Sequence, residues 1–248
     1  MPTTNRTGAK ATKSKTAFSE ADMYPPLRRA FESLGYLMRA EVNQIDATAV
    51  KDGRLLLFEL KKSFNISLVF QGMRRQSVSP YVYLVVPRQK AKNLAHMKRL
   101  VKSLGMGLIF IAMDSPLKTV EIIIDPLETP EQSPPKKTNP RKTAAALREI
   151  RARSLDGNSA GSAGGKLLTA FREGSIHIAC ALYKNGAAAP KDLAALGCPA
   201  NTAAILKSNP YGWFTRLARG VYFLTDQGFA AVSEGGEFPE VFKYYMEK

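Results

Sequence analysis

The sequence has few of the residues that build zinc sites and disulfide frameworks. Among its 248 residues the only cysteines and histidines are Cys180, Cys198, His96 and His177. None of them stands in the CxxC or HxxxH spacing from which a four-ligand zinc site is assembled. Free cysteine is commonly buried, so we expect both thiols to be unpaired and the chain to reside in a reducing cytoplasm. The two isolated histidines are expected to be structural.

Long apolar runs are also missing. The longest, residues 107–113 and 120–124, fall far short of the ~20 residues that span a bilayer. The segment before Ala17 is basic and rich in Thr and Ser but has no apolar stretch, so it does not resemble a secretory signal. We therefore expect no membrane association.

Acidic residues are scarce relative to basic ones. The chain has 36 Lys and Arg against 21 Asp and Glu, which gives a formal net charge of +15. A surface of this charge attracts polyanions, and nucleic acid is the first partner to consider, followed by an anionic membrane surface. A basic protein directed to RNA or to a membrane surface is a further alternative. Charge alone identifies neither the sequence that is read nor a chemical reaction.

Composition divides the chain into four parts. Residues 1–17 form a basic arm that we expect to be disordered, and residues 18–126 alternate between helical and strand patterns. Residues 127–165 are rich in Pro, Gly and Ser, which is typical of a linker, although residues 143–153 fit a short basic helix. Residues 166–248 form a second, smaller domain.

The first domain is predicted to be α/β, with a mixed sheet flanked by helices. The expected order is helix, three strands, helix, strand, helix and two strands, over residues 24–34, 36–42, 45–50, 55–60, 67–76, 81–86, 91–104, 108–112 and 119–124. The pair Asp52-Gly53 is typical of a tight hairpin turn. The first three strands are therefore expected to form an antiparallel meander.

The second domain has the pattern of a winged helix of the α+β class. Helices are expected after Lys166, from Pro190 and over residues 203–208, and a hairpin over residues 213–224. In a winged helix the third helix enters the major groove and the wing contacts phosphate. The residues predicted to contact DNA here are Lys207, Arg216 and Arg219. Winged helices also mediate protein contacts, so this alternative stays open.

Two acids and a lysine are predicted to converge on one face of the first-domain hairpin. Glu59 and Lys61 share a face because residues two apart on a strand do so, and pairing around the turn places Asp46 almost opposite Glu59. Two adjacent carboxylates repel unless a cation lies between them, and oxygen ligands suit Mg²⁺ or Mn²⁺. Such a metal activates water, and a lysine can stabilise a phosphate, which fits phosphodiester hydrolysis.

The same three residues also fit a solvent-facing strand edge, with Glu59 and Lys61 as an exposed ion pair. The composition of the strand argues against this interpretation, because Leu57, Phe58 and Leu60 make it apolar on both faces. Charged residues at the end of a buried strand are costly unless they have a role.

The pattern at this point resembles a known family. Ile45-Asp46, twelve residues, and then Glu59-Leu60-Lys61, with a helix before and after, are similar to the PD-(D/E)XK nuclease superfamily over roughly residues 20–125. Ile45 stands where the motif name has Pro, a position that is relaxed in the superfamily. More narrowly, a bacterial family of unknown function, described as PD-(D/E)XK phosphodiesterases, is similar in residues 20–26, 41–42, 71–72, 83–87 and 209–214.

The resemblance implies a restriction-endonuclease-like fold with Asp46 and Glu59 as metal ligands and Lys61 as the catalytic lysine. Gln71 resembles a glutamine of some branches, where it would orient the water, although it could equally make a structural hydrogen bond. Glu41 or Glu20 matches an additional acid of the family, and Glu41 is taken as a third metal ligand.

Basic residues near these positions are candidate phosphate contacts. They are Lys62, Arg74 and Arg75. Together these features predict a Mg²⁺- or Mn²⁺-dependent phosphodiesterase that acts on DNA rather than RNA and is targeted by a winged helix; related cores often act as homodimers. The alternative is a non-catalytic DNA-binding or regulatory protein built on a nuclease-like core.

Overall fold

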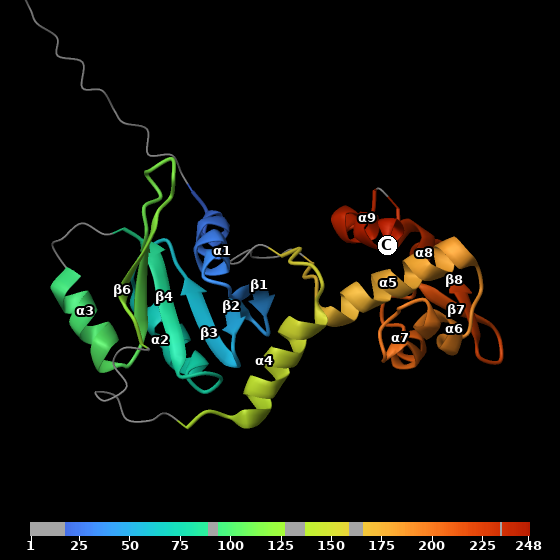
Figure 1. Cartoon of the computed structure of the whole chain (residues 1–248), viewed down its shortest axis with the longest axis horizontal. Helices are drawn as coiled ribbons and strands as arrows, with labels where there is room; N and C mark the ends of the chain where they lie inside the picture. Colours follow the sequence, from blue (N-terminus) through green and yellow to red (C-terminus); the bar gives the residue numbers. More distant parts are fainter. Residues whose placement is uncertain (1–17, 89–93, 127–136, 159–165, 234) are drawn as a thin grey trace, which may run out of the picture.

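The computed structural model describes residues 18–88, 94–126, 137–158, 166–233 and 235–248. They form two lobes that lie side by side, a six-stranded sheet with its helices and a smaller lobe of helices with one hairpin (Figure 1). The predicted basic arm, residues 1–17, and the linker residues 127–136 and 159–165 lie outside the described residues. In the ranges described, the helices are too short or too polar to cross a membrane.

The first lobe follows the predicted order of elements. After a 3₁₀ turn (Ala21–Met23), these elements are α1 (Tyr24–Ser33), β1 (Leu37–Val42), β2 (Ile45–Lys51), β3 (Arg54–Leu60), α2 (Ile66–Arg75), β4 (Tyr81–Pro87), α3 (Leu94–Ser103), β5 (Gly107–Ile111) and β6 (Val120–Ile124). Their ends agree with the predicted ranges to within one residue, apart from α3, whose first predicted residues lie outside the described ranges.

The sheet is mixed and its strands lie in sequence order. β1, β2 and β3 pair antiparallel, β3, β4 and β5 pair parallel, and β6 is antiparallel to β5. In the turn between β2 and β3, Asp52 and Gly53 have φ angles of 49° and 76°, because a type I′ hairpin turn needs positive φ at both positions. The predicted α/β class and antiparallel meander are confirmed.

Alternation along the strands sends side chains into two separate cores. One core lies under α1 and contains the stacked rings of Phe58 and Tyr83, whose centroids are 5.3 Å apart. The other lies under α2, α3 and α4 (Pro140–Ala152) and contains Leu57. Because Glu59 follows Leu57 by two residues, its side chain is directed to the second core, the one that α2 covers.

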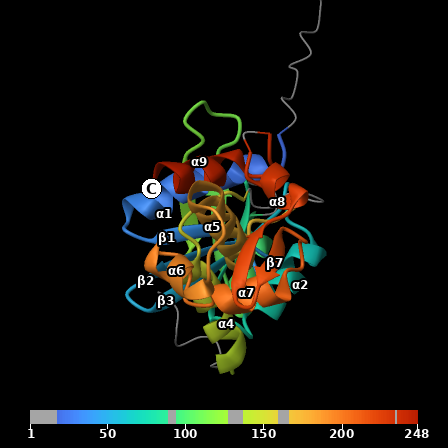
Figure 2. The same ribbon diagram turned by 90° about the vertical axis from the view of Figure 1, so that its right-hand side faces the viewer.

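A helix within the segment predicted to be a linker packs against the sheet. α4 buries Ala146 and Ile150 in the second core, and its Asn139 cap accepts hydrogen bonds from the N–H groups of Arg141 and Lys142. The helix lies between the lobes in Figure 1, and in the view turned by 90° it extends below the second lobe (Figure 2). The two lobes therefore share α4 as a common structural element.

The second lobe is built around one long helix. Its elements are α5 (Ala170–Asn185), α6 (Pro190–Ala195), α7 (Thr202–Ser208), β7 (Phe214–Ala218), β8 (Val221–Leu224), α8 (Asp226–Ala231) and α9 (Pro239–Glu247). The three helices and the hairpin were predicted, whereas α8 and α9 were missed. Both cysteines are free and buried, as expected.

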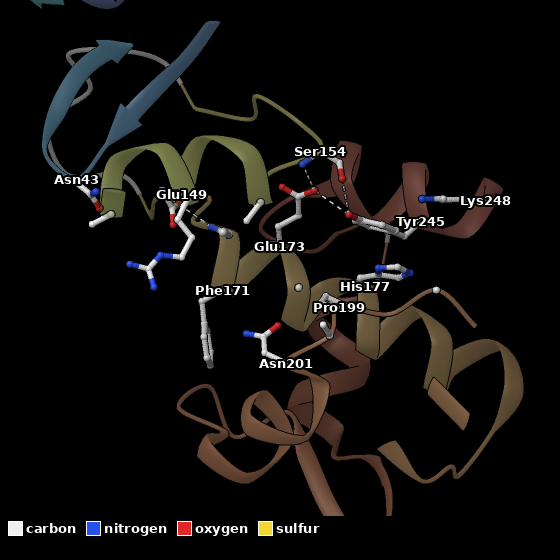
Figure 3. Close-up of a pocket in the computed structure, with 17 residues that line it drawn as sticks. Asn43, Glu149, Ser154, Phe171, Glu173, His177, Pro199, Asn201, Tyr245 and Lys248 are labelled. Carbon is white, nitrogen blue, oxygen red and sulfur yellow. Dashed lines mark hydrogen bonds between the residues drawn. The ribbon is translucent and has the colours of Figure 1, made fainter. Parts of the chain in front are cut away.

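A buried carboxylate ties the end of α4 to the second lobe. Glu173 on α5 is 1% exposed, and its Oε1 accepts hydrogen bonds from the N–H of Ser154 at 2.9 Å and from the hydroxyl of Tyr245 at 2.8 Å (Figure 3). Burial raises the pKa of Tyr245, which keeps its hydroxyl protonated as a donor. α4, α5 and α9 are thus joined at one point.

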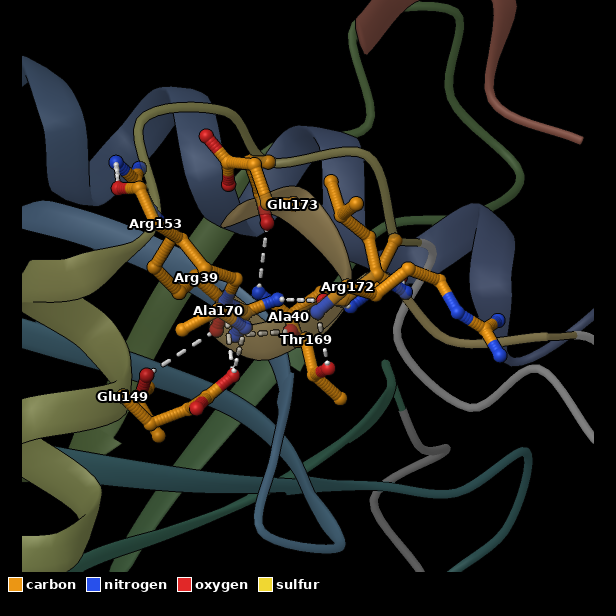
Figure 4. A network of polar contacts seen from close by, with 12 residues as sticks. Arg39, Ala40, Glu149, Arg153, Thr169, Ala170, Arg172 and Glu173 are labelled. Atoms are coloured by element: carbon orange, nitrogen blue, oxygen red, sulfur yellow. Dashed lines mark hydrogen bonds and ion pairs between the residues drawn. The ribbon is translucent and has the colours of Figure 1, made fainter. Parts of the chain in front are cut away.

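Two buried arginines extend this junction to the sheet. Arg153 donates to the carbonyls of Ala40 on β1 and of Leu168, which precedes α5, both at 3.0 Å (Figure 4). Arg39 on β1 donates to the carbonyl of Arg153, also at 3.0 Å. Because these bonds satisfy buried groups of both lobes, a polar network connects them at the end of α4.

Candidate metal and phosphodiester site

Asp46 and Glu59 lie on adjacent antiparallel strands. Ala47 pairs with Phe58, so the next position in the same register places Asp46 opposite Glu59. The N–H of Leu60 donates to Oδ2 of Asp46 at 2.8 Å, which holds the Asp46 side chain against β3. The structure therefore brings together the two acids for which the sequence predicts proximity.

Lys61 is held beside these acids by Glu20. Its Nζ lies 3.2 Å from Oε2 of Glu20, and the N–H of Lys62 donates to the other oxygen of Glu20 at 3.3 Å. Glu20 directly precedes the 3₁₀ turn that leads into α1, so it reaches the site from the start of the described chain. The charge of Lys61 also acts on Asp46, where it offsets part of the increase in pKa that burial causes.

Arg75 enters the site from α2. Its Nε contacts Oε1 of Glu59, and its Nη2 donates to the carbonyl of Gln44 in the turn before β2. From the sequence, Arg75 is predicted to contact a phosphate of the substrate. In this structure its guanidinium instead contacts a carboxylate of the site. The signal that could have revealed this contact is the helical spacing, because Arg75 follows Gln71 by four residues and shares its face of α2.

Two buried oxygen atoms, one in this cluster and one on the face of α2 that carries Arg75, have no hydrogen-bond partner among the described residues. They are Oε2 of Glu59 and Oε1 of Gln71. A buried acceptor without a donor is costly, so each such atom marks a position where a cation or a water molecule would be stabilising. Glu59 is itself fully buried, which makes its unused oxygen the stronger of the two signals.

Burial sets the protonation of both acids. It raises the pKa of Glu59 to about 7, with a further increase from the neighbouring Asp46 and an opposing effect from Arg75. Burial also raises the pKa of Asp46, against the hydrogen bond from Leu60 and the charge of Lys61. Because burial favours the protonated form of both acids, a divalent cation would shift both carboxylates toward the ionised form.

This donor set fits a hard cation of the Mg²⁺ type. Mg²⁺ is commonly bound through one or two carboxylates, with water and substrate phosphate as its other ligands. Asp46 and Glu59 supply two carboxylates, and Gln71 carries a further oxygen on the helix above. Within the part of the chain that the structure describes, no group of three or more acidic, His or Cys side chains gathers closely enough to hold a metal. Water and phosphate would complete the coordination.

Comparison with protein families supports the same superfamily. Residues 109–231 match the model of a family described as "Putative PD-(D/E)XK phosphodiesterase (DUF2161)". The chain resembles this phosphodiesterase family. The match covers just under half of the chain, from β5 to α8, so it includes α4 but not Asp46, Glu59 or Lys61. No curated protein and no solved structure matches the chain.

Glu41, the third acid predicted from the resemblance to the PD-(D/E)XK family, lies on β1, the strand that pairs with β2. Glu41 lies between two paired positions of β1, and the register places it opposite Asp46. Its φ of 50° breaks the regular alternation of side chains at this point of the strand. Glu41 is not gathered with Asp46 and Glu59 into a group of three among the described residues. Its role as a metal ligand stays a prediction.

The other basic residues predicted to contact nucleic acid are exposed and occur on both lobes. Lys62 follows the site lysine, and Arg74 lies in the last turn of α2. On the second lobe, the exposed residues are Lys207 on α7, Arg216 on β7 and Arg219 in the hairpin turn. Their contacts with nucleic acid stay predictions.

Proposed function

We propose that the chain is a metal-dependent phosphodiesterase of the nuclease type that acts on DNA, with Mg²⁺ or Mn²⁺ held by Asp46 and Glu59. The observation that carries this proposal is a pair of facing carboxylates, one of them with an unpartnered buried oxygen, beside the ammonium group of Lys61. The description of the family that the chain resembles names the same class of reaction.

The residues of the site divide the chemistry between them. A bound divalent metal supplies an acidic water and polarises a phosphate oxygen. Asp46 and Glu59 would hold the metal, and the ammonium of Lys61 would stabilise negative charge that develops on the phosphate. Glu20 keeps that ammonium in position through its ion pair. Gln71, whose Oε1 is buried without a partner, would accept a hydrogen bond from the attacking water.

The second lobe supports a role in DNA targeting. Three helices followed by a hairpin are the pattern of a winged helix, and Lys207, Arg216 and Arg219 are exposed on α7 and the hairpin. The net charge of +15 favours a polyanionic substrate. A homodimer and a cytoplasmic location stay predictions, and light scattering of the purified protein tests the first.

Cleavage assays test the proposed reaction. Purified protein is incubated with duplex DNA, single-stranded DNA and RNA in Mg²⁺, Mn²⁺ or EDTA. We expect cleavage that needs metal, prefers DNA and falls by about 10²-fold or more in Asp46→Asn and Glu59→Gln. Asp52→Asn, the same change at an exposed acid of the β2–β3 turn, is the matched control. Cleavage that persists in both site variants would refute the assignment.

One observation favours the alternative of a non-catalytic DNA-binding protein. The guanidinium of Arg75 already supplies positive charge to Glu59, where the proposed reaction places a metal. This alternative predicts DNA binding that is salt-dependent and unchanged in Asp46→Asn, with no cleavage in either metal.

A further inference from the structure

Two neighbouring cavities lie along α4. The first, of about 400 Å³, borders the candidate site and is lined by Gln44, Arg74, Arg75 and Lys142, among others. Arg75, which contacts Glu59, is the lining residue that links this cavity to the candidate site.

The second cavity, of about 540 Å³, lies between α4 and the second lobe, where Asn201 and Lys248 line it (Figure 3). Asn201 directly precedes α7, the helix predicted to bind DNA. Asn43 and Ala145 line both cavities. The two cavities are therefore adjacent, and we call them together the α4 groove.

A single face of α4 borders this groove. Lys142, Ala145, Arg148 and Ala152 line it at intervals of three or four residues, while Ile150 on the opposite face is buried under the sheet. The helix cannot rotate away from the groove without exposing its buried face. The basic side chains of α4 are therefore held at the groove.

The basic side chains of the groove are more available to a ligand than its acidic side chains. Lys142 and Arg148 are exposed and make no ion pair with any described residue. The acids of the groove are already engaged, since Glu149 accepts from the N–H of Ala170 at 2.8 Å and lies 3.6 Å from buried Arg153. Oε1 of Glu173 accepts two hydrogen bonds within the junction, whereas its buried Oε2 has no hydrogen-bond partner among the described residues. Positive charge is thus left for a ligand.

We propose that the α4 groove holds the sugar-phosphate backbone of a nucleic acid strand and leads it from Arg75, beside the candidate metal site, to the start of α7. The class of ligand rests on the proposed function, whereas the path rests on the groove itself. Exposed cations along one helix edge suit a repeating anion, because each phosphate contact releases counterions. The buried hydrogen-bond network of Arg39 and Arg153 at the end of α4 holds the two ends of this path in a fixed relative position.

Binding in the absence of metal tests this path without requiring cleavage. Anisotropy of short labelled single-stranded and duplex DNA is measured in EDTA over a salt series. We expect Lys142→Glu/Arg148→Glu to weaken binding by about tenfold or more and to reduce the slope of log K against log salt by about two. The control is Arg99→Glu/Lys102→Glu on α3, which makes the same charge change at exposed positions away from the groove.

Several outcomes would overturn the proposal. Equal weakening in the two double variants would mean that binding follows net charge alone, and unchanged affinity in the α4 variant would exclude the groove. A poly-glutamate peptide that binds as tightly, with the same loss in the α4 variant, would identify a general polyanion surface. If the α4 variant does not melt like the wild type, Lys142→Gln/Arg148→Gln takes its place, with a smaller expected loss of about threefold.

These results separate the path from the proposed reaction. Loss of binding in the α4 variant, in a protein that cleaves nothing, supports the groove and refutes hydrolysis. Metal-dependent cleavage together with unimpaired binding in that variant supports hydrolysis and refutes the groove.

Discussion

Arg75 on α2 and the fully buried Glu59 on β3 form a partly buried ion pair in the candidate site. The same guanidinium also donates to the carbonyl of Gln44, so α2 is tied to the sheet and to the turn before β2. A metal at Glu59 would share this carboxylate with Arg75 or displace it. The guanidinium of Arg75 therefore competes with a bound cation for the carboxylate of Glu59.

Replacement of Arg75 by Met tests this competition. We expect Arg75→Met to destabilise the metal-free protein by about 3 kcal/mol, because it leaves Glu59 buried without its partner. At a pH where Glu59 is ionised, Mn²⁺ affinity measured by calorimetry should rise by about tenfold, since a competing charge is removed. Arg74→Met, at the exposed neighbouring position, is the control. Weaker Mn²⁺ binding in Arg75→Met would mean that Arg75 supports the metal site.

The raised pKa of Glu59 predicts how stability depends on pH. Its carboxyl has a pKa of about 7 in the folded chain against the ordinary 4.5, so the folded state binds the proton more tightly than the unfolded state does. Stability of the metal-free protein is therefore highest below the ordinary pKa. It should fall by about 3 kcal/mol as the pH rises to about 7 and above.

Urea unfolding in EDTA measures this dependence, with Glu59→Gln as the variant that lacks the titrating group. We expect the decline between about pH 5 and pH 8 to be smaller in Glu59→Gln than in the wild type. Mn²⁺ affinity should change in the opposite direction and increase through this range, because the metal needs the ionised carboxylate. Identical pH profiles for the two proteins would contradict the assignment.

Local sequence signals were sufficient to predict most of the helices and strands of the first lobe. Strand alternation and the Asp52-Gly53 turn fix the register of β2 and β3, and that register alone brings Asp46 opposite Glu59. Such signals depend only on residues close in sequence. They therefore predict the strands and the facing acids together.

The contacts that could not be predicted join residues far apart in the chain. Glu20 reaches Lys61, and Glu173 reaches Tyr245, only because packed elements place them together. The helix α9 was missed although a signal was present, since Pro239 opens it and the buried Val241 and Tyr245 are four residues apart. Its sequence is short, and its partner α5 lies far from it in the chain.

Gly72 determines how closely α2 approaches the sheet. A Cβ atom at this position would lie 2.6 Å from Cδ2 of Leu84 and 2.7 Å from Sδ of Met106. We expect Gly72→Ala to move α2, to destabilise the fold by about 1–3 kcal/mol and to weaken Mn²⁺ binding, because Gln71 and Arg75 lie on the same helix. Ser67→Ala, at an exposed position of α2, should change neither melting temperature nor affinity. An unaltered melting temperature in Gly72→Ala would show that the helix has room to adjust.

Asp156 is the acid that fastens the end of the α4 segment to the first lobe. Its side chain is 1% exposed, accepts from the N–H of Ala40 at 3.0 Å, lies 3.3 Å from Nη1 of Arg28 and also accepts from the hydroxyl of Tyr24. Asp156→Ala leaves the buried hydroxyl of Tyr24 and the buried N–H of Ala40 without this acceptor. We expect a loss of about 3 kcal/mol in unfolding free energy.

Hydrogen exchange distinguishes a local effect at this junction from general destabilisation. In Asp156→Ala the amide of Ala40 should exchange much faster than the amides of β4 and β5, because the latter keep their strand partners. Asp114→Ala, at an exposed acid after β5, is the control and should leave both exchange rates unchanged. Uniform acceleration across the sheet would mean that Asp156 stabilises the whole lobe rather than its connection to α4. In that case the alignment of the α4 groove with the metal site would depend on the helix packing of Ala146 and Ile150 instead.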